Sequence, residues 1–190
     1  MRKKAKSQEA GYDIVEHVHR LSSWAASLAA SQPRHRFKAS AGLAIIEKAK
    51  LKEFLRNPHS AVDPTSIDSL HREWRMTVIG IATTEAPQAQ FTHGIAAKLI
   101  NIYFKVGLIT IGNQQIKLVN ALHPPIDSMV LEGLADDDRE SNPVRAAFWR
   151  TRRWTRFDCK EYEEVIQKVR EKLGPKTPLW KIEKFFPGHQ

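Results

Sequence analysis

Apolar residues recur at intervals of three and four positions along most of this chain, and no stretch alternates apolar and polar residues as a strand does. The first such series begins after Tyr12 and consists of Ile14, Val18, Leu21, Ala25 and Leu28. Because an α-helix has about 3.6 residues per turn, this spacing collects the series on one helical face. The absence of alternation elsewhere predicts an all-α fold.

Helical spacing continues through the first two thirds of the chain. Residues 41–57 predict a second helix, rich in lysine, and the apolar series within 67–81 predicts a third, preceded by a capping aspartate and a proline. Residues 83–90 predict a loop. A fourth helix is expected to begin near Gly94 and to run to Val106, and residues 113–122 predict a short additional helical segment.

Prolines and caps mark the helices of the last third. Helices are expected to start after Pro125 and at Pro143, and residues 148–157 form a mixed aromatic and basic segment. The capping-box residues Asp158 and Glu161 predict the start of a further helix, which ends at Gly174 and Pro175. A short helix over residues 178–186 is the last predicted element.

Length and composition limit the class of protein. The 190 residues suit one domain, which we place at 12–190 after a basic, flexible N-terminus at 1–11. With 42% hydrophobic residues and a net charge of +9, a folded protein that binds nucleic acid is expected, and an anionic membrane surface is a distant second partner. No apolar run is long enough to span a bilayer. A soluble, cytoplasmic, nucleoid-associated monomer is the resulting prediction.

The single cysteine, Cys159, excludes an intrachain disulfide, a thiolate-rich zinc site and a four-cysteine iron–sulfur cluster. His17 and His19 are separated by one residue on a predicted helix, so they lie on different faces and are not expected to share a metal. No cofactor and no metal are therefore predicted.

Asp127 follows His-Pro-Pro-Ile and precedes an apolar run, which places it at a helix start. Its ordinary role there is to cap the helix, because free backbone N–H groups favour a carboxylate. Lys98 is expected in the first turn of the helix after Gly94, on one face with Asn101 and Lys105, and its ordinary role is that of a solvated lysine. The alternative is that the two residues form a catalytic pair.

The two segments together resemble the helix-hairpin-helix base-excision DNA glycosylases, the superfamily of endonuclease III and the 8-oxoguanine glycosylases. The hairpin of that superfamily commonly reads Leu-Pro-Gly-x-Gly-x-Lys, and this chain reads THGIAAK from Thr92 to Lys98, with Gly94 matching the first glycine and Ala96 in place of the second. PPIDSMVL resembles the segment that carries the catalytic aspartate, which aligns with Asp127. The resemblance covers residues 91–134 and is closest in style to the archaeal 8-oxoguanine branch.

This resemblance implies a two-lobed helical domain around a cleft, with a helix-hairpin-helix element and the activities of a DNA glycosylase and AP lyase. Lys98 would attack the sugar C1′ and form a Schiff base, and Asp127 would stabilise positive charge or assist proton transfer. A helix N-terminus, partial burial and nearby positive charges favour the neutral amine that this attack requires. The partner would be double-stranded DNA with an extruded base, and an oxidised purine is the favoured substrate.

Two further groups of residues are predicted to contact the DNA. The hairpin backbone faces a phosphate when it opens a helix, and the arginines of the mixed segment suit backbone phosphates. The DNA-binding candidates are His93, Gly94, Ala96, Arg150, Arg152 and Arg153. The candidate walls of a base pocket include Phe91, Tyr103 and Trp154, although packing in the core is the ordinary role of aromatic residues.

Three other functions remain open at this point. One is a glycosylase that acts on the hypermodified bases with which some phages protect their DNA. Another is a DNA-binding module that keeps the hairpin and the charge but performs no chemistry, and the third is a basic helical adaptor for protein or RNA. The module predicts salt-sensitive DNA binding that ignores base damage, whereas the adaptor predicts weak DNA binding.

Overall fold

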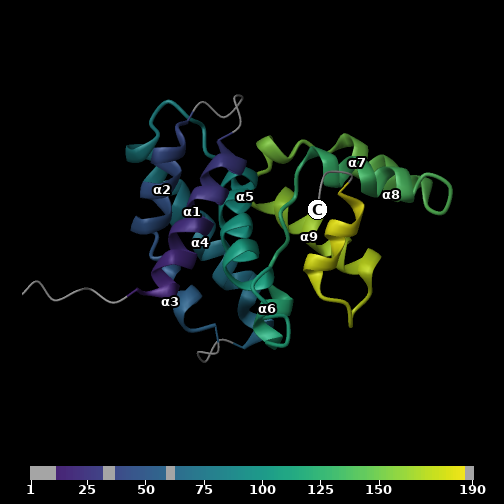
Figure 1. Ribbon diagram of the computed structural model, residues 1–190. Coiled ribbons are helices and arrows are strands. Elements are labelled where there is room, and N and C mark those ends of the chain that lie inside the picture. The colour runs from purple at the N-terminus through teal and green to yellow at the C-terminus, as the bar shows by residue number, and fades with distance from the viewer. Residues whose placement is uncertain (1–11, 32–36, 59–62, 187–190) are drawn as a thin grey trace, which may run out of the picture.

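The computed structural model describes residues 12–31, 37–58 and 63–186 of the chain. The predicted flexible segment at 1–11 lies outside these residues. Among the residues described, the backbone forms helices joined by turns and contains no strand (Figure 1). The all-α prediction is confirmed.

The N-terminal part is a series of helices close to those predicted. The elements are α1 (Ile14–Ala30), α2 (Ala39–Lys48), α3 (Leu51–Arg56), the short 3-10 helix η2 (Pro64–Ser66), α4 (Ile67–Glu85), α5 (His93–Phe104), the π-helical turn η3 (Lys105–Ile109) and α6 (Lys117–Ala121).

The prediction of one helix over 41–57 is wrong. Lys50 adopts a left-handed backbone with φ of 56°, which ends α2 and starts α3 in a new direction. Helix α4 also continues to Glu85, into the predicted loop.

Side-chain caps start most helices of the C-terminal part where the sequence predicts them. The elements are α7 (Ser128–Asp137), α8 (Pro143–Thr151), the 3-10 helix η4 (Trp154–Arg156), α9 (Cys159–Leu173) and the 3-10 helix η5 (Leu179–Phe185). Asp127 and Asn142 cap α7 and α8, and Asp158 and Glu161 form the complete capping box of α9. These caps satisfy backbone N–H groups that a helix start leaves without partners.

Helix α5 occupies the middle of the molecule. Figure 1 shows α1, α2 and α4 on one side of it and α7, α8 and α9 on the other. Every α5 residue except His93 and Ile102 is buried, as expected for a helix with neighbours on more than one side. A polar side chain on α5 therefore lies in the interior of the protein and requires a partner there.

Helix α1 buries the face opposite to its largest apolar residues. Its buried residues are small or polar and include Ser22, Ser23 and Ser27, whereas Leu21 and Trp24 are 49% and 54% exposed. A methyl group built on Gly42 of α2 would lie 2.6 Å from the Ser27 hydroxyl oxygen, so the backbones approach closely. Small residues permit this approach and leucine or tryptophan would prevent it. The sequence pattern of α1 does not reveal this orientation.

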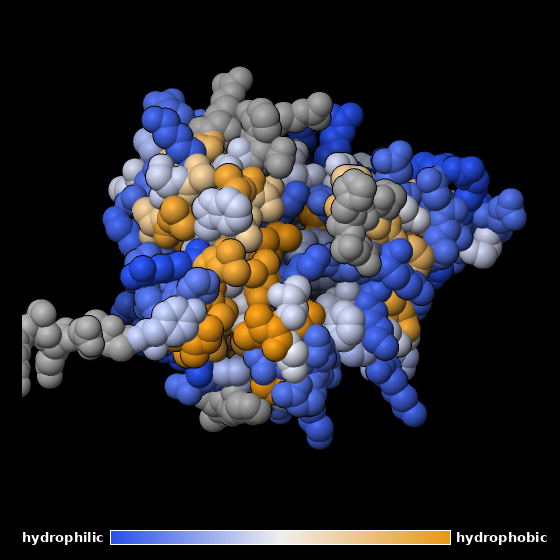
Figure 2. Space-filling model, viewed as in Figure 1, coloured by the Kyte–Doolittle hydropathy of each residue, from blue (hydrophilic) through white to orange (hydrophobic). Residues whose placement is uncertain are grey.

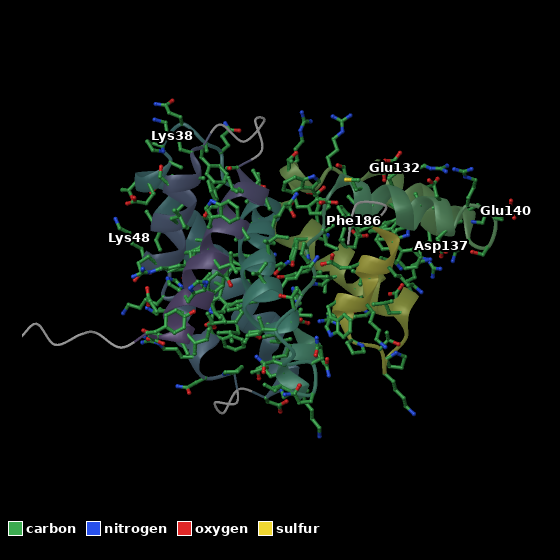
Figure 3. All side chains as sticks on the ribbon, in the orientation of Figure 1. Lys38, Lys48, Glu132, Asp137, Glu140 and Phe186 are labelled. Carbon is green, nitrogen blue, oxygen red and sulfur yellow. The ribbon has the colours of Figure 1, made fainter. Side chains whose placement is uncertain are left out.

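Charged side chains cover much of the outer surface. In Figure 3, Lys38 and Lys48 point outwards at the end of the molecule that contains α2, and Glu140 projects at the tip beyond α7. Within the described residues, no helix combines the length and the apolar character needed to cross a membrane.

Candidate active site

Lys98 and Asp127 lie side by side, although they are 29 residues apart in the chain. The Lys98 Nζ donates to Asp127 Oδ2 at 3.3 Å, and both side chains are largely buried. Lys98 is the sixth residue of α5 and thus lies in its second turn, not in the first turn as predicted. Its position is set by α5, and that of Asp127 by the start of α7.

Asp127 performs two tasks with its two carboxylate oxygens. Oδ1 accepts a hydrogen bond from the backbone N–H of Val130 at 3.0 Å and caps α7, while Oδ2 faces the Lys98 ammonium. The capping role and the pairing with Lys98 are therefore compatible. Because the cap fixes the side-chain rotamer, the second oxygen is held towards Lys98.

The alternative of a solvated surface lysine does not hold for Lys98. Lys98 is 8% exposed, and its Nζ lies 4.5 Å from the ring centroid of Trp154, over the ring face. An ammonium group is attracted to the face of an indole. Asn101, expected on the same solvated face, is 2% exposed. The amine is thus held between a carboxylate and an aromatic ring, in surroundings from which most water is excluded.

Gly94 explains why Trp154 can reach Lys98. A Cβ atom at position 94 would lie 1.7 Å from the carbonyl oxygen of Trp154, which no side chain can tolerate. The missing side chain lets η4 pack directly on the start of α5, and the Thr92 hydroxyl donates to the Thr155 carbonyl at 3.1 Å. Thr92 also caps α5 by accepting from the backbone N–H of Ile95. Gly94 is therefore a packing residue of the site.

Replacing Gly94 with alanine is expected to lower the free energy of unfolding by about 3 kcal/mol, because η4 must move away from α5. Gly80→Ala is the matched control, since Gly80 is an exposed residue within α4 and an added Cβ meets nothing within 4 Å. It should raise stability by about 0.5–1 kcal/mol through helix propensity. Denaturant unfolding measures both, and equal effects of the two variants would contradict the close packing.

A buried network of hydrogen bonds fixes the segment that precedes Asp127. The Asn101 amide donates to the carbonyl of Pro124 at 2.8 Å and to the Tyr162 hydroxyl at 3.1 Å, and it accepts from His71 Nε2 at 2.7 Å. This ties α5, one turn after Lys98, to α4, α9 and the proline segment. Asn101 is the residue of this site that the sequence prediction missed, because an asparagine on a helix gives no sign of its burial.

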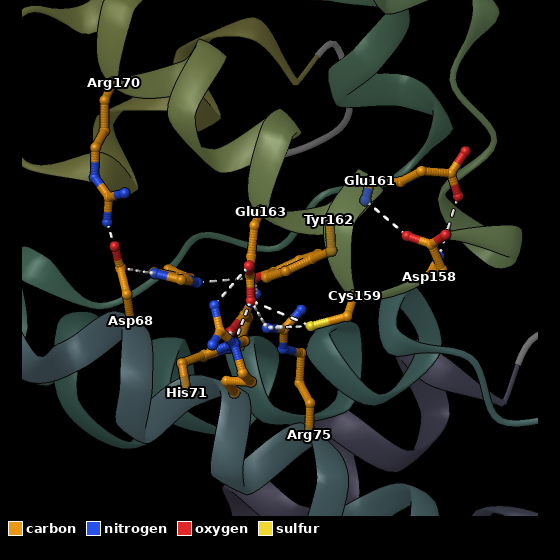
Figure 4. A network of polar contacts seen from close by, with 12 residues as sticks. Asp68, His71, Arg75, Asp158, Cys159, Glu161, Tyr162, Glu163 and Arg170 are labelled. Atoms are coloured by element: carbon orange, nitrogen blue, oxygen red, sulfur yellow. Dashed lines mark hydrogen bonds and ion pairs between the residues drawn. The ribbon is translucent and has the colours of Figure 1, made fainter.

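His123 continues this network to the surface. Its Nδ1 accepts from the Tyr162 hydroxyl at 3.1 Å and its Nε2 donates to Asp68 at 2.8 Å, while Arg170 donates to the same carboxylate at 2.5 Å (Figure 4). Both hydrogen bonds of His123 are satisfied in the neutral form. The segment from His123 to Asp127 is therefore held at both ends.

Burial lowers the pKa of His71 well below its usual value, and burial also lowers that of His123. A histidine that is neutral when folded and takes up a proton when unfolded adds stability above its unfolded pKa, and this stability is lost as the pH falls. We expect the free energy of unfolding to fall as the pH drops below ~6.5, by about 1 kcal/mol per pH unit from His71, with a further decrease in the same direction from His123.

Denaturant unfolding between pH 7 and pH 5 tests this expectation. His71→Gln should clearly reduce the slope, because the buried titration with the more strongly lowered pKa is removed. His17→Gln is the control, since His17 is exposed on α1. A slope that His71→Gln leaves unchanged would contradict the assignment.

A second cluster joins α4 to α9 (Figure 4). Glu163 accepts from Arg72 and from the fully buried Arg75, and the pKa of Glu163 is lowered to about 2, chiefly by the hydrogen bond from Arg72. Burial lowers the pKa of His93 and raises that of the Cys159 thiol. The protonated thiol is consistent with a structural role for Cys159.

The remaining predicted DNA contacts lie at different depths. Gly94 and Ala96 are buried, and His93 is half-buried at the start of α5. Arg150 lies 3.6 Å from Asp136, and Arg152 pairs with Glu164 at 3.0 Å and covers the Phe148 ring. Arg153 is exposed next to η4. These contacts stay predictions.

Of the three aromatic residues predicted for a base pocket, Trp154 is the one in contact with Lys98 among the described residues. Phe91 packs against Phe37 with ring centroids 4.8 Å apart. Tyr103 is fully buried between α1 and α5, and its hydroxyl is 2.9 Å from His19 Nδ1. Phe91 and Tyr103 thus have packing roles in this structure.

A cavity of about 780 Å³ lies away from the Lys98 and Asp127 pair. It is lined by residues that include Asp68, Asn120 and Arg170. In the part of the chain that the structure describes, no three histidine, cysteine, aspartate or glutamate side chains are grouped to hold a metal ion.

Comparison with known proteins identifies no relative. No protein-family model matches the sequence, and no significant match is found among curated proteins or solved structures.

Proposed function

We propose that the chain is a helix-hairpin-helix DNA glycosylase with AP-lyase activity, which removes a damaged or modified base through a lysine Schiff base. The observation that supports this proposal is the buried pair of Lys98 and Asp127, 3.3 Å apart, with the Lys98 amine against the Trp154 ring. A buried lysine and carboxylate from separate segments, enclosed by an aromatic ring, suit nucleophilic catalysis on a sugar carbon. An oxidised purine is the favoured substrate.

In the proposed reaction the Lys98 amine first transfers a proton to Asp127 and then attacks C1′ of the extruded nucleotide. The C1′–N bond to the base breaks, the bonding electrons leave with the base, and a proton neutralises it. One proton of the C1′-bound amine then moves by way of Asp127 to the ring oxygen O4′ as the C1′–O4′ bond breaks, which gives a Schiff base between C1′ and Nζ. The Asp127 carboxylate next accepts a proton from C2′, the 3′-phosphate leaves and the strand is cleaved, and water hydrolyses the Schiff base to release Lys98. In this proposal Asp127 accepts, holds and returns each proton.

In this proposal the protein binds DNA through its net positive charge and its exposed arginines. The net charge of +9 favours a polyanion, and Arg153 lies exposed beside η4, next to Trp154. The turn from Thr92 into α5 serves as the hairpin, and the groups of helices on the two sides of α5 serve as the two lobes. A nucleoid-associated location in the cytoplasm would follow from this binding.

Borohydride trapping tests the proposal. The purified protein is incubated with labelled duplexes that carry oxidised purines, other damaged bases or hypermodified bases, and borohydride reduces any imine to a stable amine. A covalent adduct on one class of duplex, located at Lys98 by peptide mass spectrometry, is the expected result. Absence of an adduct and of strand cleavage on every duplex, with DNA binding retained, would instead support the non-catalytic binding module.

One observation favours that second candidate. Ala96 occupies the position of the second glycine in the hairpin of the helix-hairpin-helix glycosylases, so this chain matches the hairpin pattern only in part. A binding module predicts equal affinity for damaged and undamaged duplexes, with binding that weakens steeply as salt is added. Comparing the two affinities by fluorescence anisotropy separates it from the glycosylase, which should prefer one kind of altered base.

A further inference from the structure

Helix α1 carries a row of exposed side chains that are not buried against the rest of the protein. The residues are Ile14, His17, Leu21, Trp24 and Leu28, which we call the α1 seam. Their spacing of three and four positions aligns them along one side of the helix, and Tyr12 packs against His17 at the N-terminal end. Figure 2 shows apolar side chains gathered over the part of the surface where Figure 1 draws α1.

The seam is well exposed in the structure. Ile14, Leu21 and Leu28 are 58%, 49% and 43% exposed, and Trp24 is 54% exposed. The opposite face of α1 already packs on α2 and α5 through small residues, so the seam cannot turn inwards without forcing large side chains into that close contact. An apolar helical face of this length is normally covered by another element.

The seam contains no lysine, arginine, aspartate or glutamate. Glu16, which lies beside it, is already paired with Arg20 at 2.9 Å and with Lys52. Covering the seam would therefore bury apolar surface without leaving a charge unpaired in a dry environment. The α1 seam of a second copy of the protein is equally apolar and also lacks charged residues, so the two seams can cover each other without burying an unpaired charge.

The area suits a modest interface. From the exposed fractions of Tyr12, Ile14, Leu21, Trp24 and Leu28, each copy offers about 450 Å² of mostly apolar side-chain surface. Two copies would bury about 900 Å² through these residues, close to the lower limit of roughly 1,000 Å² for a specific interface. The expected association is weak, with a Kd on the order of micromolar.

We propose that the protein forms a homodimer in which the α1 seams of two copies pack antiparallel about a two-fold axis near Leu21. A two-fold axis places the same patch of each copy on the other, and ridges with this spacing interlock across two helices. This proposal replaces the monomer expected from the sequence and does not depend on the proposed enzymatic function. Because each copy carries a charge of +9, added salt should strengthen the dimer, whereas it weakens DNA binding.

Sedimentation velocity of the full chain, from micromolar to near-millimolar concentration and at low and high salt, tests the dimer. Leu21→Glu should shift the protein to a monomer, because it places a charge at the centre of the interface. Met76→Glu is the matched control, since Met76 is 60% exposed on α4 and lies outside the seam. A natural protein that remains monomeric throughout, or a dimer that Leu21→Glu leaves intact, would overturn the proposal.

A crosslinking variant keeps the test valid if Leu21→Glu disturbs folding. In a Cys159→Ser background, Leu21→Cys should form a disulfide-linked dimer under mild oxidation, because the two copies of position 21 meet near the axis. Met76→Cys in the same background should not. Equal crosslinking of the two variants would show random collision and would also overturn the proposal.

Discussion

Replacing Lys98 with glutamine is expected to reduce base excision, strand cleavage and borohydride adduct formation to background on the duplex that the natural protein processes. Glutamine has nearly the same length and can still donate a hydrogen bond to Asp127, but its amide nitrogen is not a nucleophile. The expected loss exceeds a factor of about 10³, as for removal of a covalent nucleophile. Gel-resolved single-turnover assays measure it.

Lys105→Gln is the matched control for Lys98→Gln. Lys105 follows α5 directly, is partly buried and pairs with Glu183. Its replacement should change stability slightly and leave the adduct intact. If Lys98→Gln retains the adduct, another amine is the nucleophile, and the proposed role of Lys98 is contradicted. Binding of the Lys98→Gln protein to the same duplex shows whether the loss lies in chemistry or in affinity.

Replacing Asp127 with asparagine is expected to slow the single-turnover rate about 10²- to 10⁴-fold, the range for removing a general acid or base. Asparagine is also a good N-cap and can accept from the Val130 N–H, so the fall expected in unfolding temperature comes from the loss of the largely buried ion pair with Lys98 and not from the cap. Asp127→Ala should show the same loss of rate and an additional loss of about 1 kcal/mol in stability. The two variants thus separate the charge of Asp127 from its capping role.

Asp158→Asn is the control for Asp127→Asn. Asp158 caps α9 as Asp127 caps α7, so the same substitution is made at another helix start. If the two substitutions slow the reaction equally, the effect of Asp127→Asn comes from the fold and not from a carboxylate next to Lys98. DNA affinity measured alongside should be unchanged by either, since neither carboxylate is expected to contact phosphate.

The helix starts could be predicted because their causes are local. Asp127 and Asp158 cap the residues that directly follow them, and Pro143 starts α8 within the same few positions. The single-helix prediction over 41–57 failed because nothing in the local pattern marks Lys50 for a left-handed backbone. That conformation is maintained by the packing of α2 and α3 on the rest of the protein.

The candidate site could be predicted only in part. Lys98 and Asp127 were recognised together through a resemblance of short segments, and they do lie 3.3 Å apart. Trp154 was one of several aromatic candidates, and its selection depends on the close approach of η4 to Gly94. Asn101 was missed, because its partners come from α4, α9 and the proline segment before α7.

Periodicity, caps and prolines already specify an all-helical chain and the places where most helices begin, because these signals act over a few neighbouring residues. Which face of a helix is buried depends on the shapes of the elements that pack against it. In α1, packing against the neighbouring helices buries the serines and leaves Leu21 and Trp24 exposed. In α5, packing against neighbouring elements encloses Lys98 beside Asp127. Both results arise from contacts between residues far apart in the chain, which no local pattern records.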